Sequence, residues 1–300
     1  MRFRIRFALF GAITAVALTG FSANAGEGYV RDSVLYIPGG TRAVRAYSFA
    51  DRDDFREIRF EAPVKVTEIG EYAFLGCCNL RELSLPRTVR TLGEGCFREC
   101  TGLRMAVLPS GLTALPRYLF AWCGSLEEVE MPSGLTDIAA HAFAYCGALE
   151  EIDIPCSVTH IGSNAFSFCG SLREVSVPDA VTELESYAFS ECVSLRSARL
   201  PGRRDLLGEL IFSGCRALER IEEPSAVPPA FDCDSRLFEE NESWMYSECV
   251  LYVPAGSMQA YREARGWSCF DSIEAISSGS TAMPATGSPG AESRTKEGRP

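Results

Sequence analysis

The chain has 300 residues, of which 46% are apolar and 23% are charged, with 29 basic against 40 acidic side chains. This apolar content is sufficient for a large core and differs from that of a disordered chain. The formal net charge of −11 argues against general nucleic-acid binding, which requires a basic surface.

Residues 1–25 have the pattern of a secretory signal peptide. The basic start MRFRIR precedes the apolar run FALFGAITAVAL, and ANA at Ala23–Ala25 offers a small-residue cleavage site before Gly26. The apolar run is too short to span a bilayer. We therefore expect a secreted or cell-surface protein whose mature part has no membrane span and keeps 26 of the 29 basic side chains.

Residues 26–224 are built from a 23-residue repeat. SNAFSFCGSLREVSVP at 163–178 is a near-copy of AHAFAYCGALEEIDIP at 140–155. Phe recurs at 74, 97, 120, 143, 166, 189 and 212. In each unit Cys, Leu and Pro follow this Phe by three, six and twelve residues. The residue directly before this Pro is large and apolar in every unit except the last, where it is Glu223. A unit this short cannot bury its own apolar face, so the repeat predicts a solenoid in which stacked units share one core.

Each unit predicts one short strand of a parallel sheet. Val175-Ser176-Val177 and Ile152-Asp153-Ile154 alternate apolar and polar residues, as strands with one buried face do. The following Pro ends the strand because it cannot donate to the ladder. A second apolar corner follows, and the A-F-x-x-C segment places Phe and Cys one helical or 3₁₀ turn apart.

The repeated Cys is best explained as a small buried side chain that packs below a ladder of stacked Phe rings. Disulfides between neighbouring coils compete with this interpretation, but seven members cannot pair completely. Metal binding is disfavoured because the column has no C-x-x-C and no second ligand column. Outside the column, Cys96 takes a buried slot, Cys78 and Cys156 fall on turns, and a pair among Cys233, Cys249 and Cys269 is plausible in an oxidising compartment.

Residues 277–300 have almost no large apolar side chains, which predicts a disordered tail. The MPATG sequence at 283–287 is similar to a sortase sorting signal, which also requires a following apolar segment that is not present. How the protein is retained at a surface is left open.

The sequence SLREVSVPDAVTELESYAFSEC resembles the BspA-type leucine-rich repeat, also called the Treponema pallidum type. The resemblance covers about residues 30–224. It implies a leucine-rich repeat solenoid of the α/β horseshoe type, with mostly short parallel strands joined by turns and short 3₁₀ or helical pieces. Members are associated with adhesion to host matrix proteins, host cells or other bacteria, and the family has no catalytic motif.

Residues 225–276 resemble an irregular connector followed by the usual C-terminal cap of this family. In LYVPAGSMQAYREARGWSCF, Leu251–Val253 would form one more strand, Ser257 would cap a short helix and Gly266 would end it. Three aromatic residues, Tyr261, Trp267 and Phe270, would cover the open end of the core. Within the repeats, Arg204 replaces the corner Val, which predicts a bulge in that coil.

Two surfaces are candidate binding sites. The outward strand positions, expected on the concave side, carry an acidic stripe, with arginines farther along the same face. The stripe would bind a basic protein segment, although it would also serve as a solvated face that prevents aggregation. The stripe consists of Glu128, Glu130, Glu151, Asp153 and Glu174.

The second candidate is an aromatic strip one residue before the ladder Cys, formed by Trp122, Tyr145 and Phe168. It would stack against sugars or peptides, or pack against the neighbouring coil. The column Thr113, Thr136, Thr159 and Thr182 is interpreted as a structural ladder.

These patterns favour a binding protein over an enzyme. The best catalytic combination, Cys156 with His160 near Asp153, lies in variable repeat columns and lacks an evident pocket. No cofactor or metal is expected, and the partner would be a protein or glycan, with a host matrix protein as one candidate. The alternative is a structural, self-assembling surface component without a foreign ligand, and the oligomeric state is left open.

Overall fold

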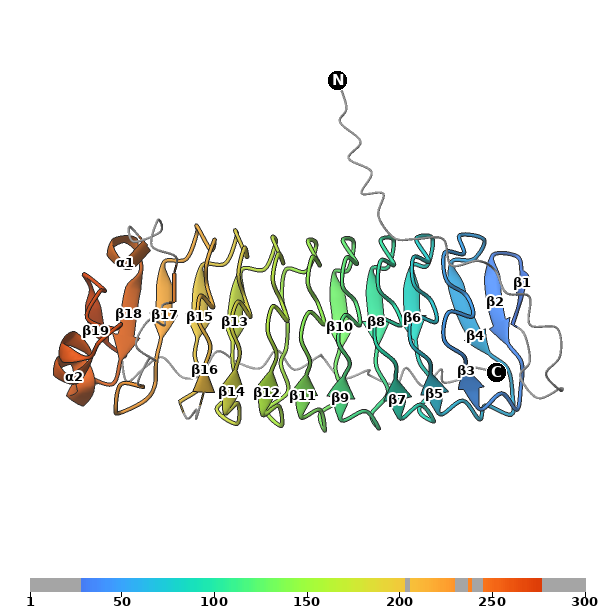
Figure 1. Ribbon diagram of the computed structural model, residues 1–300, viewed down its shortest axis with the longest axis horizontal. Coiled ribbons are helices and arrows are strands. Elements are labelled where there is room, and N and C mark those ends of the chain that lie inside the picture. The colour runs from blue at the N-terminus through green and yellow to red at the C-terminus, as the bar shows by residue number, and fades with distance from the viewer. Residues whose placement is uncertain (1–27, 203–205, 230–236, 239–244, 277–300) are drawn as a thin grey trace, which may run out of the picture.

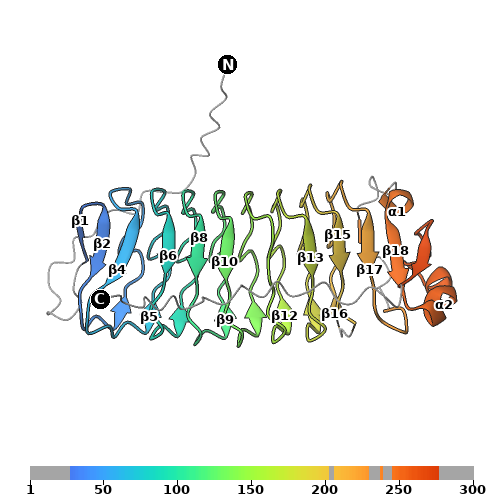
Figure 2. The same ribbon diagram turned by 180° about the vertical axis from the view of Figure 1, so that it is seen from behind.

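The computed structural model describes residues 28–202, 206–229, 237–238 and 245–276. Figures 1 and 2 show coils stacked side by side in one elongated row, with longer strands along one edge and shorter strands along the other. This arrangement confirms the leucine-rich solenoid with 23-residue repeats. The expected signal peptide at 1–25 and tail at 277–300 lie outside the described residues, as does Arg204.

The longer strands are nearly all parallel and form what we call the long-strand face. The exception is β1, which pairs antiparallel with β2 across a tight turn in which Asp32 and Ser33 both have positive φ, as a type I′ hairpin requires. The strands are β1 (Tyr29–Arg31), β2 (Val34–Ile37), β4 (Glu57–Phe60), β6 (Glu82–Ser84), β8 (Met105–Val107), β10 (Glu128–Glu130), β13 (Glu174–Ser176), β15 (Ser197–Arg199), β17 (Arg220–Glu222), β18 (Val250–Val253) and β19 (Ile273–Ala275).

The shorter strands form the opposite, short-strand face in two parallel sheets, ordered β3-β5-β7 and β9-β11-β12-β14-β16. Despite the departure expected around Arg204, β16 continues the ladder, because Leu206 pairs with Glu183 and Leu207 with Leu184. The strands are β3 (Ala43–Val44), β5 (Glu68–Ile69), β7 (Thr91–Leu92), β9 (Ala114–Leu115), β11 (Asp137–Ile138), β12 (His160–Ile161), β14 (Glu183–Leu184) and β16 (Leu206–Leu207).

The parallel ladder of the long-strand face is broken between β4 and β6, and again at one coil that has no strand on this face. The sequence predicts a strand at Ile152-Asp153-Ile154, but residues 151–154 are not in a strand. The sheet β6-β8-β10 ends before this segment, and the sheet β13-β15-β17-β18-β19 begins after it. The prediction of one strand per unit is therefore wrong here, although Ile152 still points into the core and is buried.

The core is a continuous stack of Phe rings. Consecutive rings from Phe49 to Phe212 have centroids 5.1–6.2 Å apart, and all but Phe49 in this stack are fully buried. Each Phe begins a single 3₁₀-like turn: for example, the amide of Cys123 donates to the carbonyl of Phe120 at 3.0 Å. The helical-turn prediction for A-F-x-x-C is thus confirmed.

The ladder cysteines pack beneath these rings, as predicted, but they also form hydrogen bonds. Each thiol donates to the carbonyl oxygen of the Phe in the preceding coil: the Sγ–O distance is 3.2 Å from Cys146 to Phe120 and 3.3 Å from Cys169 to Phe143. The same bond recurs at the other five ladder positions. Cys77, Cys100, Cys123, Cys146, Cys169 and Cys192 are buried free thiols.

The other cysteines are mostly where the sequence places them. Cys96 is buried, while Cys78 and Cys156 are exposed on turns. Cys249 is buried and Cys269 is exposed, and neither forms a disulfide. The sequence left open one pair among Cys233, Cys249 and Cys269. Cys249 and Cys269 do not pair with each other, and Cys233 lies outside the described residues.

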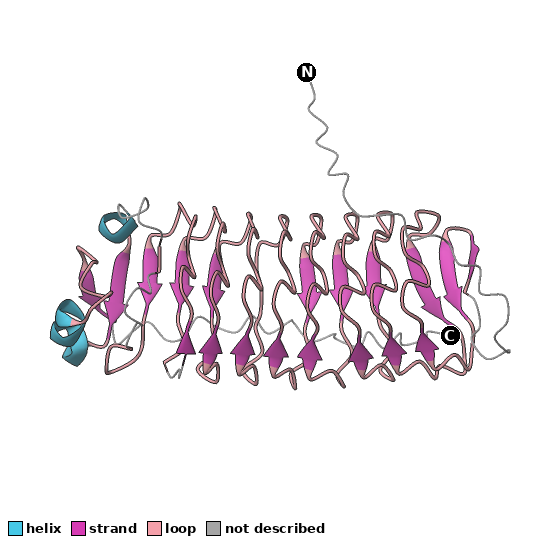
Figure 3. Cartoon of the chain, in the orientation of Figure 1, coloured by secondary structure: helices cyan, strands magenta, loops and turns pink. Residues whose placement is uncertain are grey.

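The C-terminal cap closes the row with two helices, α1 (Met245–Glu248) and α2 (Met258–Glu263), and a short 3₁₀ turn, η2 (Ala255–Ser257) (Figure 3). Tyr261 and Trp267 are fully buried and Phe270 nearly so. The indole Nε1 of Trp267 donates to the carbonyl of Pro229 at 2.8 Å. These aromatic residues cover the core, in agreement with the prediction.

Two details of the cap differ from the prediction. The hydroxyl of Ser257 does not cap α2 but donates to the carbonyl oxygen of Ala226 at 2.6 Å, which ties the helix to the connector. The helix ends at Glu263, three residues before Gly266, whose φ of 81° serves the turn that follows.

Candidate interaction surfaces

The five acidic side chains of the stripe are exposed on the long-strand face. Glu128 and Glu130 lie at the ends of β10, and Glu174 begins β13. Glu151 and Asp153 lie between these strands, in the segment that is not in a strand. The structure therefore brings the stripe together on three successive coils, and places it across the interruption of the sheet.

Electrostatic repulsion gives a physical reason for this interruption. A regular ladder would hold Glu151 between Glu128 and Glu174, with neighbouring strands about 4.8 Å apart. Like charges directly opposite one another destabilise a sheet. In a regular ladder Glu151 would have an acidic neighbour on both sides, and Asp153 would have one in Glu130. The strand β10 also carries two acidic residues, but it pairs with β8, where Met105 and Val107 are uncharged. The core residues beneath the interruption, Val129 and Ile152, are each 9% exposed.

Charge pairing differs along the long-strand face. Within the described part of the chain, the carboxylates of Glu128, Glu130, Glu151 and Glu174 form no ion pair or hydrogen bond. The arginines farther along are paired instead. Arg199 binds Asp179 at 2.9 Å, and Arg220 binds Glu222 at 3.1 Å and lies over the ring of Tyr252 at 3.6 Å.

The aromatic strip forms a second exposed feature, on the turns between the faces. The ring centroids of Trp122 and Tyr145 are 5.1 Å apart, and those of Tyr145 and Phe168 are 4.3 Å apart, with nearly parallel planes. Tyr145 and Phe168 are each 40% exposed. All three residues have φ of 60–65°, a left-handed conformation that is unfavourable for bulky side chains.

The stacking limits what this strip can offer a ligand. Tyr145 has a neighbouring ring on each face, and Arg98 covers Trp122 with its guanidinium carbon 4.5 Å from the ring centroid. The strip therefore presents mainly ring edges to solvent. This arrangement favours the packing interpretation over stacking of sugars on ring faces.

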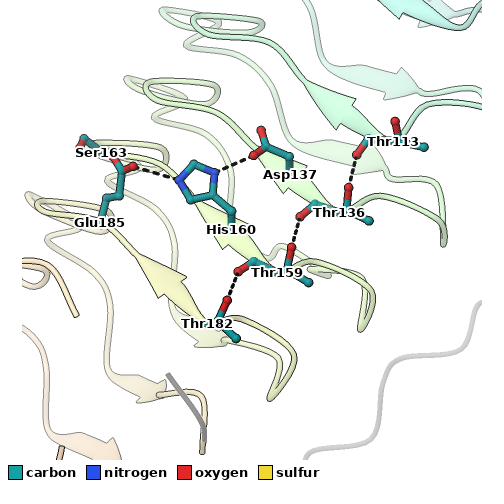
Figure 4. A network of polar contacts seen from close by, with 8 residues as sticks. All are labelled: Thr113, Thr136, Asp137, Thr159, His160, Ser163, Thr182 and Glu185. Carbon is teal, nitrogen blue, oxygen red and sulfur yellow. Dashed lines mark hydrogen bonds and ion pairs between the residues drawn. The ribbon is translucent and has the colours of Figure 1, made fainter. Parts of the chain in front are cut away.

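His160 is not part of a Cys156 site. Its Nδ1 lies 2.6 Å from Asp137 and its Nε2 lies 2.9 Å from Glu185, so both ring nitrogens are engaged on the short-strand face. Beside it, the threonine ladder is formed as predicted: Thr159 donates to the carbonyl of Thr136 at 3.1 Å, and the same bond links the neighbouring members (Figure 4).

The described ranges contain no group of three or more His, Cys, Asp or Glu side chains arranged to hold a metal ion. In the same ranges, every helix is too short or too polar to cross a membrane.

Two features of these surfaces were not predicted from the sequence. The thiol-to-carbonyl bonds join residues 26 positions apart, or 28 for Cys77 and Phe49. The sequence signal for them is the invariant Phe and Cys columns themselves. The bridge at His160 has a weaker signal, since Asp137 occupies the same repeat column one unit earlier and Glu185 lies two residues beyond that column one unit later.

The stacked parallel strands, the Leu and Phe core and the 23-residue period define a leucine-rich repeat protein. Residues 33–150 and 136–239 match the model of the BspA type leucine rich repeat region, in 6 copies. The chain belongs to this family.

Solved structures support the same fold. A leucine-rich repeat protein from Bacteroides ovatus is 22% identical over 81% of this chain and 61% of its own, with a TM-score of 0.57. The pneumococcal vaccine antigen PcpA is 20% identical over 82% of this chain and 68% of its own, with a TM-score of 0.50. The Treponema pallidum leucine-rich repeat protein is 27% identical over 65% and 80%, respectively, with a TM-score of 0.43. No curated protein matches the chain.

Proposed function

We propose that this protein is a secreted or cell-surface binding protein of adhesin type, and that its acidic stripe binds a basic segment of a macromolecular partner. The observation that carries the proposal is that Glu128, Glu130, Glu151 and Glu174, on neighbouring coils, have no ion-pair or hydrogen-bond partner among the residues that the structure describes. Carboxylates that repel one another within the fold gain most when a partner supplies the opposite charge.

The position of the stripe also limits the length of the basic segment that a partner can present. Arg104 precedes β8 on one side of the stripe and Arg196 precedes β15 on the other. Within the stripe, Arg173 precedes β13 and pairs with Glu150 at 3.1 Å. A basic segment would therefore span about three coils, with acidic or neutral groups beyond. Because the carboxylates are exposed, we expect the charges to set the association rate and its salt dependence more than the final affinity.

A surface location is part of the proposal. The signal-peptide pattern at 1–25 supports export, and the similarity to a pneumococcal vaccine antigen is in keeping with an exposed protein. Enzymatic activity is not proposed, because His160, the base of the best catalytic combination, is held between two carboxylates away from Cys156.

The test is a binding assay with immobilised matrix proteins, mucin and a Lys-rich peptide. Glu151→Gln/Glu174→Gln removes two stripe charges, and Glu68→Gln/Glu71→Gln removes two exposed charges away from the stripe. We expect saturable binding by the wild type that weakens at higher salt. Binding should be several-fold weaker in Glu151→Gln/Glu174→Gln and unchanged in Glu68→Gln/Glu71→Gln. Equal binding by both variants would contradict the assignment of the stripe.

The same assay separates the alternative function. If no probe binds and sizing shows concentration-dependent self-association, the protein is an assembly component. In that case the exposed rings of Tyr145 and Phe168 are the contact to change first, because their edges are exposed to solvent.

A further inference from the structure

One histidine joins three successive coils on the short-strand face. His160 in β12 lies between Asp137 of β11 and Glu185, which follows β14 (Figure 4). Its Nδ1 is 2.6 Å from Asp137 Oδ2, and its Nε2 is 2.9 Å from Glu185 Oε1. The units 132–154, 155–177 and 178–200 are thus linked through one imidazole ring.

The geometry requires a charged imidazole. Both atoms that face the ring are carboxylate oxygens, which accept hydrogen bonds and cannot donate when ionised. Neutral imidazole carries one N–H, so one of the two contacts would then set a lone pair against a carboxylate. The imidazolium form donates from both nitrogens, and each of these bonds is charge-assisted.

Glu185 is fixed in its ionised form by further donors. The backbone amide and the hydroxyl of Ser163 donate to its Oε2, at 2.8 and 2.6 Å. Hydrogen bonds from the Ser163 hydroxyl and from His160 lower the pKa of Glu185 below its ordinary value. The bridge therefore has an anionic anchor that is held in place independently of the histidine.

The groups around the ring are all acidic. Asp137 faces it from β11, Glu185 faces it from beyond β14, and Glu183 is the register partner of His160 in β14. In the described part of the chain, no Lys or Arg forms an ion pair with any of these three carboxylates. When His160 loses its proton, the carboxylates of Asp137 and Glu185 remain on either side of a neutral ring, with Glu183 at the paired position of the neighbouring strand.

The pKa of His160 shifts in the direction that this geometry requires. Burial alone would lower the pKa, but the hydrogen bonds to Glu185 and Asp137 and the charges of these residues outweigh it, so the pKa is raised above 6.5. A raised folded-state pKa means that the stabilisation is complete below pH about 6.5 and is lost as the pH rises through the raised value. The lowered pKa of Glu185 places the acidic limit of the bridge below about pH 4.5.

The bridge lies beside the coil that has no strand on the long-strand face. The unit 132–154 is the one whose segment at 151–154 forms no strand on the long-strand face. On the short-strand face the ladder through β9, β11, β12 and β14 is continuous. With no strand pairing on the long-strand face, this unit is joined to the next one by the backbone bonds of the Phe turns and by the short-strand face, where the bridge adds to two-residue strands.

We propose that the Asp137–His160–Glu185 bridge is a proton-controlled joint, which locks these three coils together in mildly acidic surroundings and loosens them as the medium becomes alkaline. The joint requires no ligand, so it is independent of the function proposed above. It would let the protein change its local rigidity between an acidic niche and a neutral or alkaline one.

The experiment uses the mature full-length protein without any partner. Histidine-selective isotope labelling gives two ring signals, since the chain has 2 histidines. Their titration is followed by NMR, and hydrogen exchange over residues 132–190 is measured between pH 5.5 and 8.5 after correction for intrinsic rates. His160→Gln removes the charge, and His141→Gln is the matched control.

We expect His160 to titrate above 6.5, and His141 below it, since burial and Arg117 lower the pKa of His141. Corrected exchange in the wild type and in the His141→Gln protein should become several-fold faster across the His160 titration, whereas in His160→Gln it should be fast throughout. Any one of three outcomes would overturn the proposal. These are a titration of His160 at or below 6.5, exchange in the wild type that is independent of pH, and a pH dependence of exchange that is unchanged in His160→Gln. If His160→Gln fails to fold, the wild-type titration and exchange decide the question.

Discussion

The thiol of Cys146 donates a hydrogen bond to the carbonyl oxygen of Phe120, 3.2 Å away in the preceding coil. The same carbonyl accepts from the amide of Cys123 at 3.0 Å. The Cys therefore satisfies the second lone pair of a buried oxygen, in addition to filling space below the ring stack. Burial raises the pKa of Cys146 well above its ordinary value and keeps the thiol protonated, as a donor must be.

Replacing this Cys tests the bond. Cys146→Ala removes the donor and leaves a small cavity, so we expect a loss of about 1–2 kcal/mol in the free energy of unfolding, because a neutral hydrogen bond contributes about 1 kcal/mol. Urea unfolding with and without reductant measures it. A wild-type protein that is strongly destabilised by reductant would contradict the free-thiol ladder.

The burial of the ladder thiols also makes a chemical prediction. Thiolates rather than thiols react with alkylating reagents, and burial both raises the pKa of the ladder cysteines and blocks access. Among the described residues, we expect rapid native-state alkylation at the exposed Cys78, Cys156 and Cys269. Mass spectrometry of digested protein assigns the sites. Modification of Cys146 or Cys169 before unfolding would show that the coils open.

The core Phe stack and the aromatic strip should differ sharply in their contribution to stability. Phe143→Ala removes a fully buried ring from the stack and should cost roughly 3–5 kcal/mol. Phe168→Ala removes a half-exposed ring that stacks on Tyr145, which should cost about 0.5–1.5 kcal/mol. Urea denaturation of the two variants provides the comparison, and equal losses would show that the aromatic strip is structurally as important as the core.

The sequence predicts the fold well because the 23-residue period can be read directly from it. Four residue columns in register require stacking, and the structure confirms the parallel strands, the Phe ladder and the aromatic cap. The missing strand at 151–154 was not predictable from alternation, since Ile152-Asp153-Ile154 has the correct pattern and alternation within one unit carries no information on the charges of the adjacent coils. The bridge at His160 was missed because it joins residues from three units that do not all occupy the same repeat position, whereas the sequence columns compare one repeat position at a time.

The acidic stripe makes a last prediction that does not depend on any partner. Glu151 lies between the coils that carry Glu128 and Glu174, and none of the three carboxylates is paired within the described residues. Glu151→Gln should therefore stabilise the fold by roughly 0.2–1 kcal/mol, the usual size of a cross-strand charge effect. The gain should shrink at high salt, because exposed charges are screened.

Glu68→Gln is the matched control for this variant. Glu68 is also an exposed acidic residue, and it lies in β5, where its register partners Ala43 and Thr91 carry no charge. Its replacement should leave stability unchanged, and urea unfolding at low and high salt compares the two. If Glu151→Gln gives no gain at low salt, repulsion does not explain the interrupted sheet, and the conformation of residues 151–154 must be set by packing around Ile152 instead.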